Sequence, residues 1–600
     1  MNAFASLFAL LGILARPGLA LAAAPSSEPI VLHVLSAEDY IDYGSDAESF
    51  LYYDEEGNEF EFEDVLSGFE QYMLETTGKT VRVIYDTYDT NETMYSSLQT
   101  GRTKYDLICA SDYMCQKMMG QGMLQPIDIA SDVPNYDIYA SRYIKDTIAN
   151  IKATVDGEEK SFGDYAVDYM WGTLGILYNP AKVAKDKNMD EDEVKFAMKS
   201  YDALWDARFA NEMSVKDSMR DTYAIGIMKT FEEEIVKGLE DSPYFDEDYN
   251  LIDGCFDEAM ESYNVDFTKI FNRSDEKTVL EVKSTLMSLK ENVFGFEVDS
   301  GKEDMVKGLI GMNLAWSGDA VFAEDTAEGQ YGNELYYSLP ETGGNIWFDT
   351  WVMPKESEGE TREFALKFLD FLCHPDVASA NMNYIGYSTC VAGDSMLNLI
   401  RSWYDPRSFE LYAFDDAEDD FVYDDEGNYV PNEGYEEGDY TSPDGISTWD
   451  DIAEENEWDI VDLSYIYEGT LSDEVLADYP DPLGDTPSTN PYLFYTDELE
   501  EVSVGEESTV VGRQFFTQYP SKEILPKLAI MADYGPDNKY VLAMWEDVKS
   551  NNLPIAGVIL FAAVLGGLAA AIIVTVIGKT RQRKAMEKRI KAARSAANNH

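Results

Sequence analysis

Aromatic residues and a carboxylate alternate in the stretch NIWFDTWVMP at residues 345–354. If this stretch forms a β-strand, Trp347, Asp349 and Trp351 share one face, because side chains alternate between the two faces. Burying a carboxylate between indole rings is unfavourable unless a positive charge compensates it. An ammonium group would supply that charge, since a cation over an aromatic ring gains roughly 0.5–2 kcal/mol. Trp351 is expected to face elsewhere if the strand ends or bends after Asp349.

Similar pairs of an aromatic or hydroxyl residue with an acid recur at expected strand ends. They are Trp316 and Asp319 in AWSGDA, and Asp39 and Tyr40 in AEDYID. In ASDYM, Ser111 and Tyr113 stand on either side of an aspartate. An α,ω-diamine needs an acid at each end and aromatic walls along its methylene groups, and each acid adds a charge-assisted hydrogen bond. The alternative is that these tryptophans are ordinary core or interface residues.

Enzyme motifs are missing from the sequence. It has no GxSxG elbow, phosphate-binding loop, dinucleotide fingerprint or HExxH pair. With 114 acidic residues some carboxylate pair is always present, so such a pair says nothing about glycoside hydrolysis. Five cysteines without a CxxC pair and three histidines argue against zinc, and neither YDEEGN nor YDDEGN has the spacing of a calcium loop. We therefore expect no enzyme activity, no cofactor and no metal.

The net charge of −69 is extreme. Such a chain should repel nucleic acid and attract cations. The stretch from Ser408 to Gly512 contains no Lys or Arg, and we interpret 410–475 as an acidic insert whose role the sequence does not give.

Strands and helices alternate along most of the chain, which favours an α/β fold with a mostly parallel sheet. Expected strands include PIVLHVLSAEDYID, TVRVIYDTYD, KYDLICAS and YAVDYMWGTLGILYNP, and LYYDEEGNEFEFE is an expected hairpin. Expected helices include EDVLSGFEQYMLETTG, EFALKFLDFLCHPDVASANMNYIG and two within SKEILPKLAIMADYGPDNKYVLAMWEDVKS.

Both ends of the chain predict a relation to a membrane. Residues 1–22 resemble a signal peptide with cleavage near Ala22, atypical in lacking a basic residue before the apolar run. The 23 residues Ile555–Ile577 carry no charge, so we predict a transmembrane helix over 553–577. The basic tail 578–600 should be cytoplasmic, which places the rest of the chain outside the membrane.

Several motifs in a fixed order resemble one known family. They are TYDTNETMYSSLQTG at 87–101, YDLICASDYMCQKMMGQGMLQPID at 105–128, YMWGTLGILYNP, VKDSMRD at 215–221, NLAWSGDA, PETGGNIWFDTWVMP and FLCHPDVASANMNYIGYST. Together they are similar to the substrate-binding proteins of spermidine/putrescine ABC importers. The match runs from about residue 31 to 390 and resumes at GRQFFTQYPSKEILPKL.

The resemblance implies a two-lobed type II periplasmic-binding-protein fold that closes on its ligand in a cleft between the lobes. Lobe 1 would comprise residues 28–150 with about 350–395. Lobe 2 would comprise 151–349 with about 396–550, including the acidic insert.

The resemblance also implies ligand-binding residues. Amine-holding acids would be Asp39, Asp319 and Asp349, with Asp221 as a weaker candidate; aromatic walls would be Trp316 and Trp347; Ser111 and Tyr113 would line the first lobe, and Trp171 would lie near the cleft. The family commonly has a tryptophan where this chain has Ala37, a loss that Glu38 or another aromatic residue would have to compensate.

The function implied is that of a membrane-tethered, monomeric receptor that captures putrescine or spermidine and delivers it to an ABC permease with its ATPase subunits. The alternatives are a sensor or surface interaction protein with the same fold, and a binder of another solute such as iron or thiamine. Tyr336 and Tyr337 are the only hint of an iron site, and an extracellular hydrolase is the last alternative.

Overall fold

The computed structural model describes residues 28–550 except 45–46, 48, 55–56, 102, 299, 409–413, 416–419, 422–447, 478 and 506. The predicted signal peptide, transmembrane helix and basic tail lie outside these residues, as does much of the predicted acidic insert. Within the described part of the chain, no helix is both long and apolar enough to cross a membrane.

The chain forms two compact units. Unit 1 holds the residues up to Gly172 together with Trp347–Leu499 and Gln518–Lys522, and unit 2 holds Thr173–Ile346, Glu500–Thr517 and the residues from Glu523 onward. Of the residues expected in lobe 2, four ranges belong to unit 1: 151–172, 347–349, 396–499 and 518–522. Strands β8 (Ala166–Tyr178) and β13 (Gly344–Val352) each cross a unit boundary.

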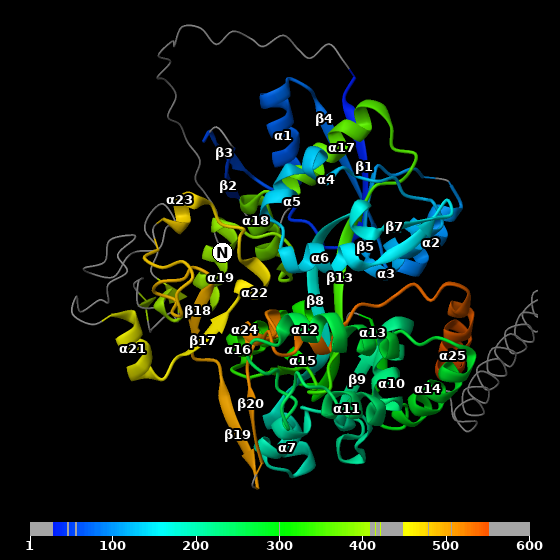
Figure 1. Cartoon of the computed structure of the whole chain (residues 1–600), viewed down its shortest axis with the longest axis vertical. Helices are drawn as coiled ribbons and strands as arrows, with labels where there is room; N and C mark the ends of the chain where they lie inside the picture. The colour runs from blue at the N-terminus through cyan, green and yellow to red at the C-terminus, as the bar shows by residue number, and fades with distance from the viewer. Residues whose placement is uncertain are drawn as a thin grey trace, which may run out of the picture. The chain divides into compact units, whose positions relative to one another are not determined.

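Unit 1 is built on parallel strands with one antiparallel neighbour. Strand β1 (Ile30–Ala37) pairs in parallel with β4 (Val81–Tyr88) and β5 (Leu107–Ser111), and β13 runs antiparallel to β5 (Figure 1). Its other strands are β2 (Phe50–Tyr53), β3 (Glu59–Phe62), β6 (Lys152–Val155), β7 (Glu158–Ser161), β14 (Ser388–Thr389), β15 (Phe414–Asp415), β16 (Asp420–Phe421), β17 (Asp459–Asp462) and β18 (Leu493–Thr496).

Helices of unit 1 cover this sheet. Helix α1 (Val65–Thr77) starts at the N-cap Asp64 and ends at the left-handed Gly78, and its Phe69 ring packs 4.9 Å from Phe368 of α17 (Gly359–Leu372). The others are α2 (Asn91–Gln99), α3 (Asp112–Gly120), α4 (Ile129–Asp132), α5 (Pro134–Tyr139), α6 (Arg142–Asn150), α18 (Pro375–Ile385), α19 (Asp394–Tyr404), α21 (Trp449–Asn456), α22 (Ser464–Tyr467) and α23 (Asp473–Leu476).

Unit 2 has its own mixed sheet. Strand β9 (Met213–Lys216) pairs in parallel with β10 (Gly295–Glu297) and β11 (Met312–Trp316), while β8 runs antiparallel to β11 and to β12 (Tyr336–Ser338). The remaining strands are β19 (Glu500–Val504), β20 (Glu507–Val511) and β21 (Leu528–Ala529).

The helices of unit 2 include a close pair, α10 (Met219–Thr230) and α14 (Glu276–Leu289) (Figure 1). Gly226 permits this contact, because a Cβ there would lie 2.7 Å from Val282. The others are α7 (Pro180–Lys187), α8 (Glu191–Ala197), α9 (Asp202–Trp205), α11 (Glu232–Glu240), α12 (Phe256–Ala259), α13 (Val265–Phe271), α15 (Ser300–Val306), α16 (Ser317–Tyr331), α24 (Gln514–Gln518) and α25 (Asn538–Ser550).

The stretch EFALKFLDFLCHPDVASANMNYIG is helical, as expected, and forms two helices, α17 and α18: His374 caps the second and Pro375 takes its first position. One expected helix is wrong. The first helix expected in SKEILPKLAIMADY is a 3₁₀ turn, Leu525–Lys527, followed by β21. Tyr336 and Tyr337, the two tyrosines considered for an iron site, lie in strand β12.

Candidate ligand-binding site

Strand β13 positions the first group of candidate residues, all in unit 1. It continues to Val352, so the condition under which Trp351 would face elsewhere, a strand that ends after Asp349, is not met. Trp351 shares the face of Asp349 but is only 1% exposed, and its ring packs 5.5 Å from Tyr169. Trp347 and Asp349 are both half-buried. Trp347 and Asp349 are thus the two partly accessible side chains of a strand that is otherwise buried.

Tyr40 is the group that contacts the Asp349 carboxylate. Its hydroxyl donates a hydrogen bond of 2.6 Å to Asp349 Oδ2. Burial and the neighbouring Asp349 charge together raise the pKa of Tyr40 well above its usual value, so the hydroxyl keeps its proton. Tyr40 was named in the sequence as the neighbour of Asp39, but it was not among the ligand-binding residues that the resemblance implied.

Tyr387 completes an aromatic corner around this carboxylate. Its ring lies 5.4 Å from the Trp347 ring and 6.0 Å from the Tyr40 ring, in edge-to-face arrangements. A half-exposed carboxylate beside aromatic faces is a site for an organic ammonium, which the rings attract and the carboxylate hydrogen-bonds. Tyr387 was missed in the sequence, where its only indication was its place in the motif NYIGYST. We refer to Tyr40, Trp347, Asp349 and Tyr387 as the Asp349 corner.

Ser111 and Tyr113 lie close to this corner in unit 1. Ser111 ends β5 directly opposite Asp349 of β13, and its hydroxyl accepts a hydrogen bond of 3.0 Å from Asn91 Nδ2. Tyr113, in the first turn of α3, donates a hydrogen bond of 3.2 Å to Glu92. Strand pairing therefore places Ser111 beside the corner. The Tyr113 hydroxyl instead bonds to a residue of α2.

Glu38 and Asp39 follow the end of β1 and are both exposed. Asp39 adopts a left-handed backbone conformation, with a φ of 50°, which turns the chain so that Tyr40 enters the core. Near Ala37, an aromatic residue is present: the Tyr85 hydroxyl donates to the Ala37 carbonyl oxygen at 2.9 Å.

Trp171 lies in β8 and is fully buried. Its ring packs 6.2 Å from Tyr519, and its backbone is opposite Ser388 of β14. A side chain so enclosed does not present its ring to a solute in this structure. The residue therefore contributes to the core of unit 1.

The second group of candidate residues lies in unit 2, where β11 ends and α16 begins. Trp316 ends the strand, and Asp319 lies in the first turn of the helix and is 7% exposed. Two lysines, which the sequence analysis missed, contact this carboxylate. Lys216 Nζ is 3.3 Å from Asp319 Oδ2, and Lys302 Nζ is 3.2 Å from Oδ1.

These lysines dominate the electrostatics of Asp319. Burial pushes its pKa up, but Lys216 and then Lys302 more than offset this, so the pKa lies below its usual value. The carboxylate is therefore ionised at neutral pH with two cations already beside it. Their only indication in the sequence was Lys216 within the VKDSMRD motif.

Asp221 belongs to the same part of unit 2. It is 8% exposed, lies in the first turn of α10, and Trp316 Nε1 is 3.4 Å from its Oδ1. Burial raises the pKa of Asp221. The structure thus brings Asp221, Trp316 and Asp319 together within one unit.

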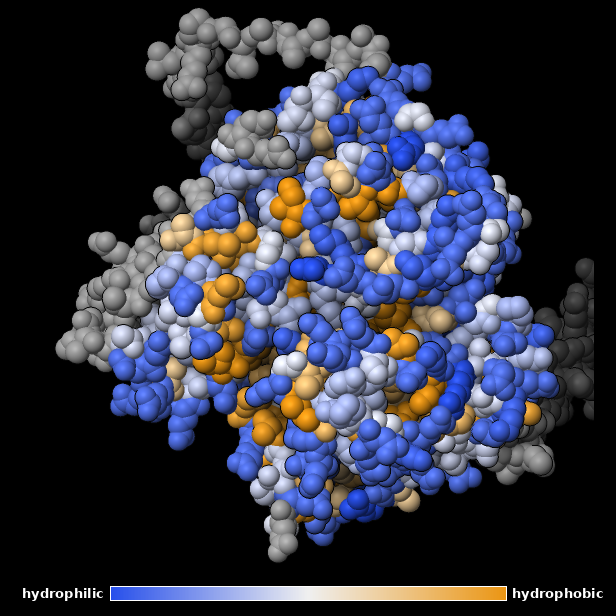
Figure 2. Space-filling view, in the orientation of Figure 1, coloured by the Kyte–Doolittle hydropathy of each residue, from blue (hydrophilic) through white to orange (hydrophobic). Residues whose placement is uncertain are grey.

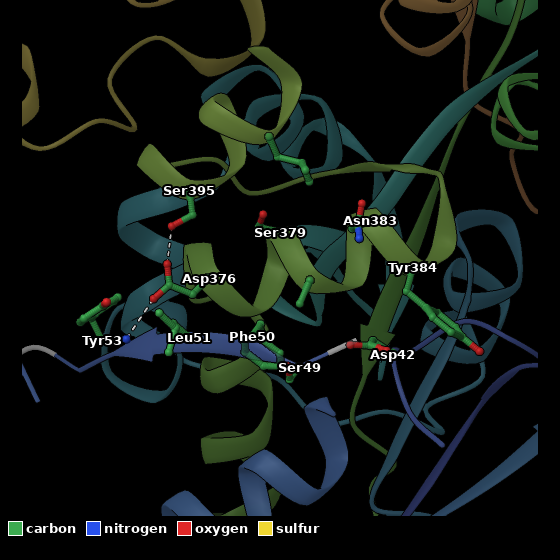
Figure 3. Close-up of a pocket in the computed structure, with 12 residues that line it drawn as sticks. Asp42, Ser49, Phe50, Leu51, Tyr53, Asp376, Ser379, Asn383, Tyr384 and Ser395 are labelled. Carbon is green, nitrogen blue, oxygen red and sulfur yellow. Dashed lines mark hydrogen bonds between the residues drawn. The ribbon is translucent and has the colours of Figure 1, made fainter. Parts of the chain in front are cut away.

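A separate hollow of about 580 Å³ lies in unit 1 beside the β2–β3 hairpin (Figure 3). Asp376 projects toward it and accepts hydrogen bonds from the Tyr53 backbone N–H, at 3.0 Å, and from the Ser395 hydroxyl. None of the ten residues selected from the sequence lines it.

Metal and disulfide chemistry find no support in the described residues. These hold no cluster of three or more His, Cys, Asp or Glu side chains suited to a metal. All five cysteines are free thiols, and four of them are buried.

Comparison with known proteins gives the family. The model of the family described as bacterial extracellular solute-binding protein matches residues 69–393, more than half of the chain. The chain belongs to this family. Membership makes it a solute-binding protein rather than an enzyme, places its binding region outside the cytoplasm, and confirms the resemblance found in the sequence.

Relatives of this solute-binding protein include the spermidine/putrescine-binding periplasmic protein of Escherichia coli (strain K12), 27% identical over 324 residues, which cover 53% of this chain and 72% of that protein. The putrescine/agmatine-binding protein of Pseudomonas aeruginosa is 23% identical over 311 residues, 51% of this chain and 70% of that one. Among solved structures, the spermidine/putrescine ABC transporter substrate-binding protein of Streptococcus pneumoniae matches with a TM-score of 0.40 and 24% identity, over 60% of this chain and 83% of that chain.

Proposed function

We propose that this solute-binding protein captures an organic amine of the polyamine class and delivers it to an ABC importer. The observation that carries the proposal is the Asp349 corner, a half-exposed carboxylate with a tyrosine hydroxyl and aromatic rings beside it. A terminal ammonium group matches this chemistry, because it donates hydrogen bonds to the carboxylate and is attracted to the ring faces. Putrescine and spermidine are the first ligands to test, since they appear in the names of the relatives.

We further propose that the receptor has the type II periplasmic-binding-protein fold and is tethered through residues 553–577. The uncharged stretch Ile555–Ile577 and the basic residues after it support a single span with a cytoplasmic tail. A tethered receptor needs separate permease and ATPase subunits, so these are the partners we propose.

The test is calorimetric titration of the full-length chain in detergent with putrescine and with spermidine. Saturable binding is expected. Asp349→Asn, which keeps the shape of the side chain and removes its charge, should weaken binding about thirtyfold, the magnitude of a lost charge-assisted hydrogen bond. Glu63→Gln, which removes an exposed carboxylate before α1, should leave binding unchanged. A folded wild-type chain that gives no heat with either polyamine would refute the amine assignment.

A further inference from the structure

The ammonium group of Lys216 lies where the sequence predicts a ligand ammonium. Lys216 ends β9 and is 1% exposed. Its Nζ is 4.2 Å from the centroid of the Trp316 ring and 3.3 Å from Asp319 Oδ2. An indole face and a carboxylate are the two groups that we expected to hold an external amine in this part of the chain.

Lys216 is also fully satisfied in this position. Besides Asp319, its Nζ lies 3.3 Å from Glu297 Oε1 and donates a hydrogen bond of 3.1 Å to the Val298 carbonyl oxygen. An ammonium group has three N–H donors, and three acceptors surround this one. The surrounding charges keep it protonated: burial lowers the pKa of Lys216, but Asp319 and Glu297 outweigh burial and raise it.

A second cation strengthens the exclusion of an external amine. Lys302 Nζ, from α15, is 3.2 Å from the other oxygen of Asp319. A ligand ammonium approaching this carboxylate would therefore meet two positive charges and no unoccupied oxygen. Like charges at such distances repel strongly where water is largely excluded.

We propose that Lys216 is a specificity-determining residue, a tethered ammonium that occupies the Asp319–Trp316 pair in place of a ligand amine. The inference rests on the proposed function, in which the Asp349 corner binds a terminal ammonium. The protein then recognises an ammonium group at the Asp349 corner of unit 1 and offers no place for one at Asp319 of unit 2. Its ligands are primary amines selected at one end, so that a diamine and a monoamine of the same chain length bind alike.

The experiment compares putrescine with butylamine on the full-length chain by calorimetric titration. In the wild type, the two dissociation constants should agree within about threefold, because an ion pair that is not made contributes no affinity. Asp319→Asn should likewise change putrescine binding by less than about threefold, whereas the isosteric Asp349→Asn should weaken it about thirtyfold.

A gain-of-function variant tests the same idea from the other side. Lys216→Thr vacates the Asp319–Trp316 pair while leaving the remaining carboxylates with partners: Asp319 keeps Lys302, and Glu297 keeps hydrogen bonds from the Gly301 N–H and the Asn313 amide. This variant should bind a second molecule of butylamine at the vacated pair in unit 2, which the wild type should not. If the variant does not fold, the Asp319→Asn comparison decides the question alone.

The outcomes separate the two proposals. Putrescine binding that exceeds butylamine binding tenfold or more in the wild type, and that Asp319→Asn abolishes, overturns the role of Lys216 and leaves the proposed function intact. A folded wild type that binds neither amine overturns both.

Discussion

The two carboxylates expected to hold an amine differ because of the groups beside them. Asp349 has a neutral hydroxyl from Tyr40, which lies 309 positions away in the sequence, and is half-buried. Asp319 has two ammonium groups and is 7% exposed. The same residue type, near a tryptophan in both stretches, thus lies beside a neutral hydroxyl in one case and beside two ammonium groups in the other.

A third carboxyl group, Asp168, is buried in β8. Tyr136 donates a hydrogen bond to its Oδ2, and Oδ1 has no hydrogen-bond partner among the residues that the structure describes. Burial raises the pKa of Asp168 from 3.8 to about 7, although the tyrosine hydrogen bond acts in the opposite direction. The folded state therefore holds this proton at pH values where the unfolded chain has lost it.

Replacing Asp168 should change how stability depends on pH. Because the folded pKa is raised, this group's contribution is largest below pH 4 and is lost as the pH rises toward 7, by up to about 1.4 kcal/mol per pH unit. Asp168→Asn cannot ionise, so we expect the variant to gain stability relative to the wild type between pH 5 and pH 8. Denaturant unfolding followed by circular dichroism at both pH values measures this; an equal difference at the two would contradict it.

At the scale of elements, the C-terminal half of strand β8 is central to unit 2, because β11 and β12 both pair with it. All thirteen of its residues are buried. Gly175 lies beside the segment of β8 that pairs with β12. A Cβ at this position would come within 2.6 Å of the Ser338 carbonyl oxygen and 2.5 Å of the Tyr337 ring. The close approach of backbone to backbone requires a glycine at this position.

Gly175→Ala should therefore destabilise unit 2 by about 1–3 kcal/mol, the usual cost of overpacking a core. Thermal denaturation followed by circular dichroism is the measurement. The matched control is Gly295→Ala in β10, another strand glycine, whose added Cβ would meet nothing within 4 Å. Equal melting temperatures for the two variants would show that the β8–β12 contact can relax.

The β2–β3 hairpin, which was expected from the sequence LYYDEEGNEFEFE, is held in unit 1 by aromatic contacts. The Tyr52 ring lies 5.4 Å from Phe371 and 4.4 Å from His374. The hairpin therefore closes the junction between α17 and α18, beside the hollow of Figure 3.

At the scale of the whole molecule, acidity is the dominant property. The net charge is −69, and hydrophilic residues cover most of the face shown in Figure 2. Most of the acids have no basic residue to pair with, since 114 acidic residues face 45 Lys and Arg. Repulsion among them destabilises the compact state and is screened by salt.

Stability should accordingly increase with ionic strength. Between about 20 mM and 500 mM sodium chloride the Debye length falls from roughly 20 Å to 4 Å, so we expect the melting temperature of the full-length chain to rise by several degrees. Differential scanning fluorimetry in detergent is the measurement, with choline chloride as a control for specific sodium binding. A melting temperature that falls with either salt would mean that attractive ion pairs outweigh the repulsion.

Local pattern determined much of the fold. The alternation of strands and helices, the helix from Asp64 to Gly78 and the strands β1, β4, β5 and β8 follow from periodicity, caps and β-branched residues, which act over a few residues. The helix start at Pro375 also follows from local pattern, since proline suits the first position of a helix. The short β21 lacked any local pattern, because its two residues are a strand only through pairing with β13.

The sequence alone determined the family and the importance of Trp347, Asp349, Trp316 and Asp319, because those residues recur in ordered motifs with an evident chemistry. Only the tertiary structure decided what each carboxylate contacts. Tyr40 reaches Asp349, Tyr387 reaches Trp347, and Lys216 reaches Asp319, although the partners lie 309, 40 and 103 positions apart in the sequence. Electrostatic and aromatic contacts depend on distances of a few ångströms, which a linear sequence does not contain.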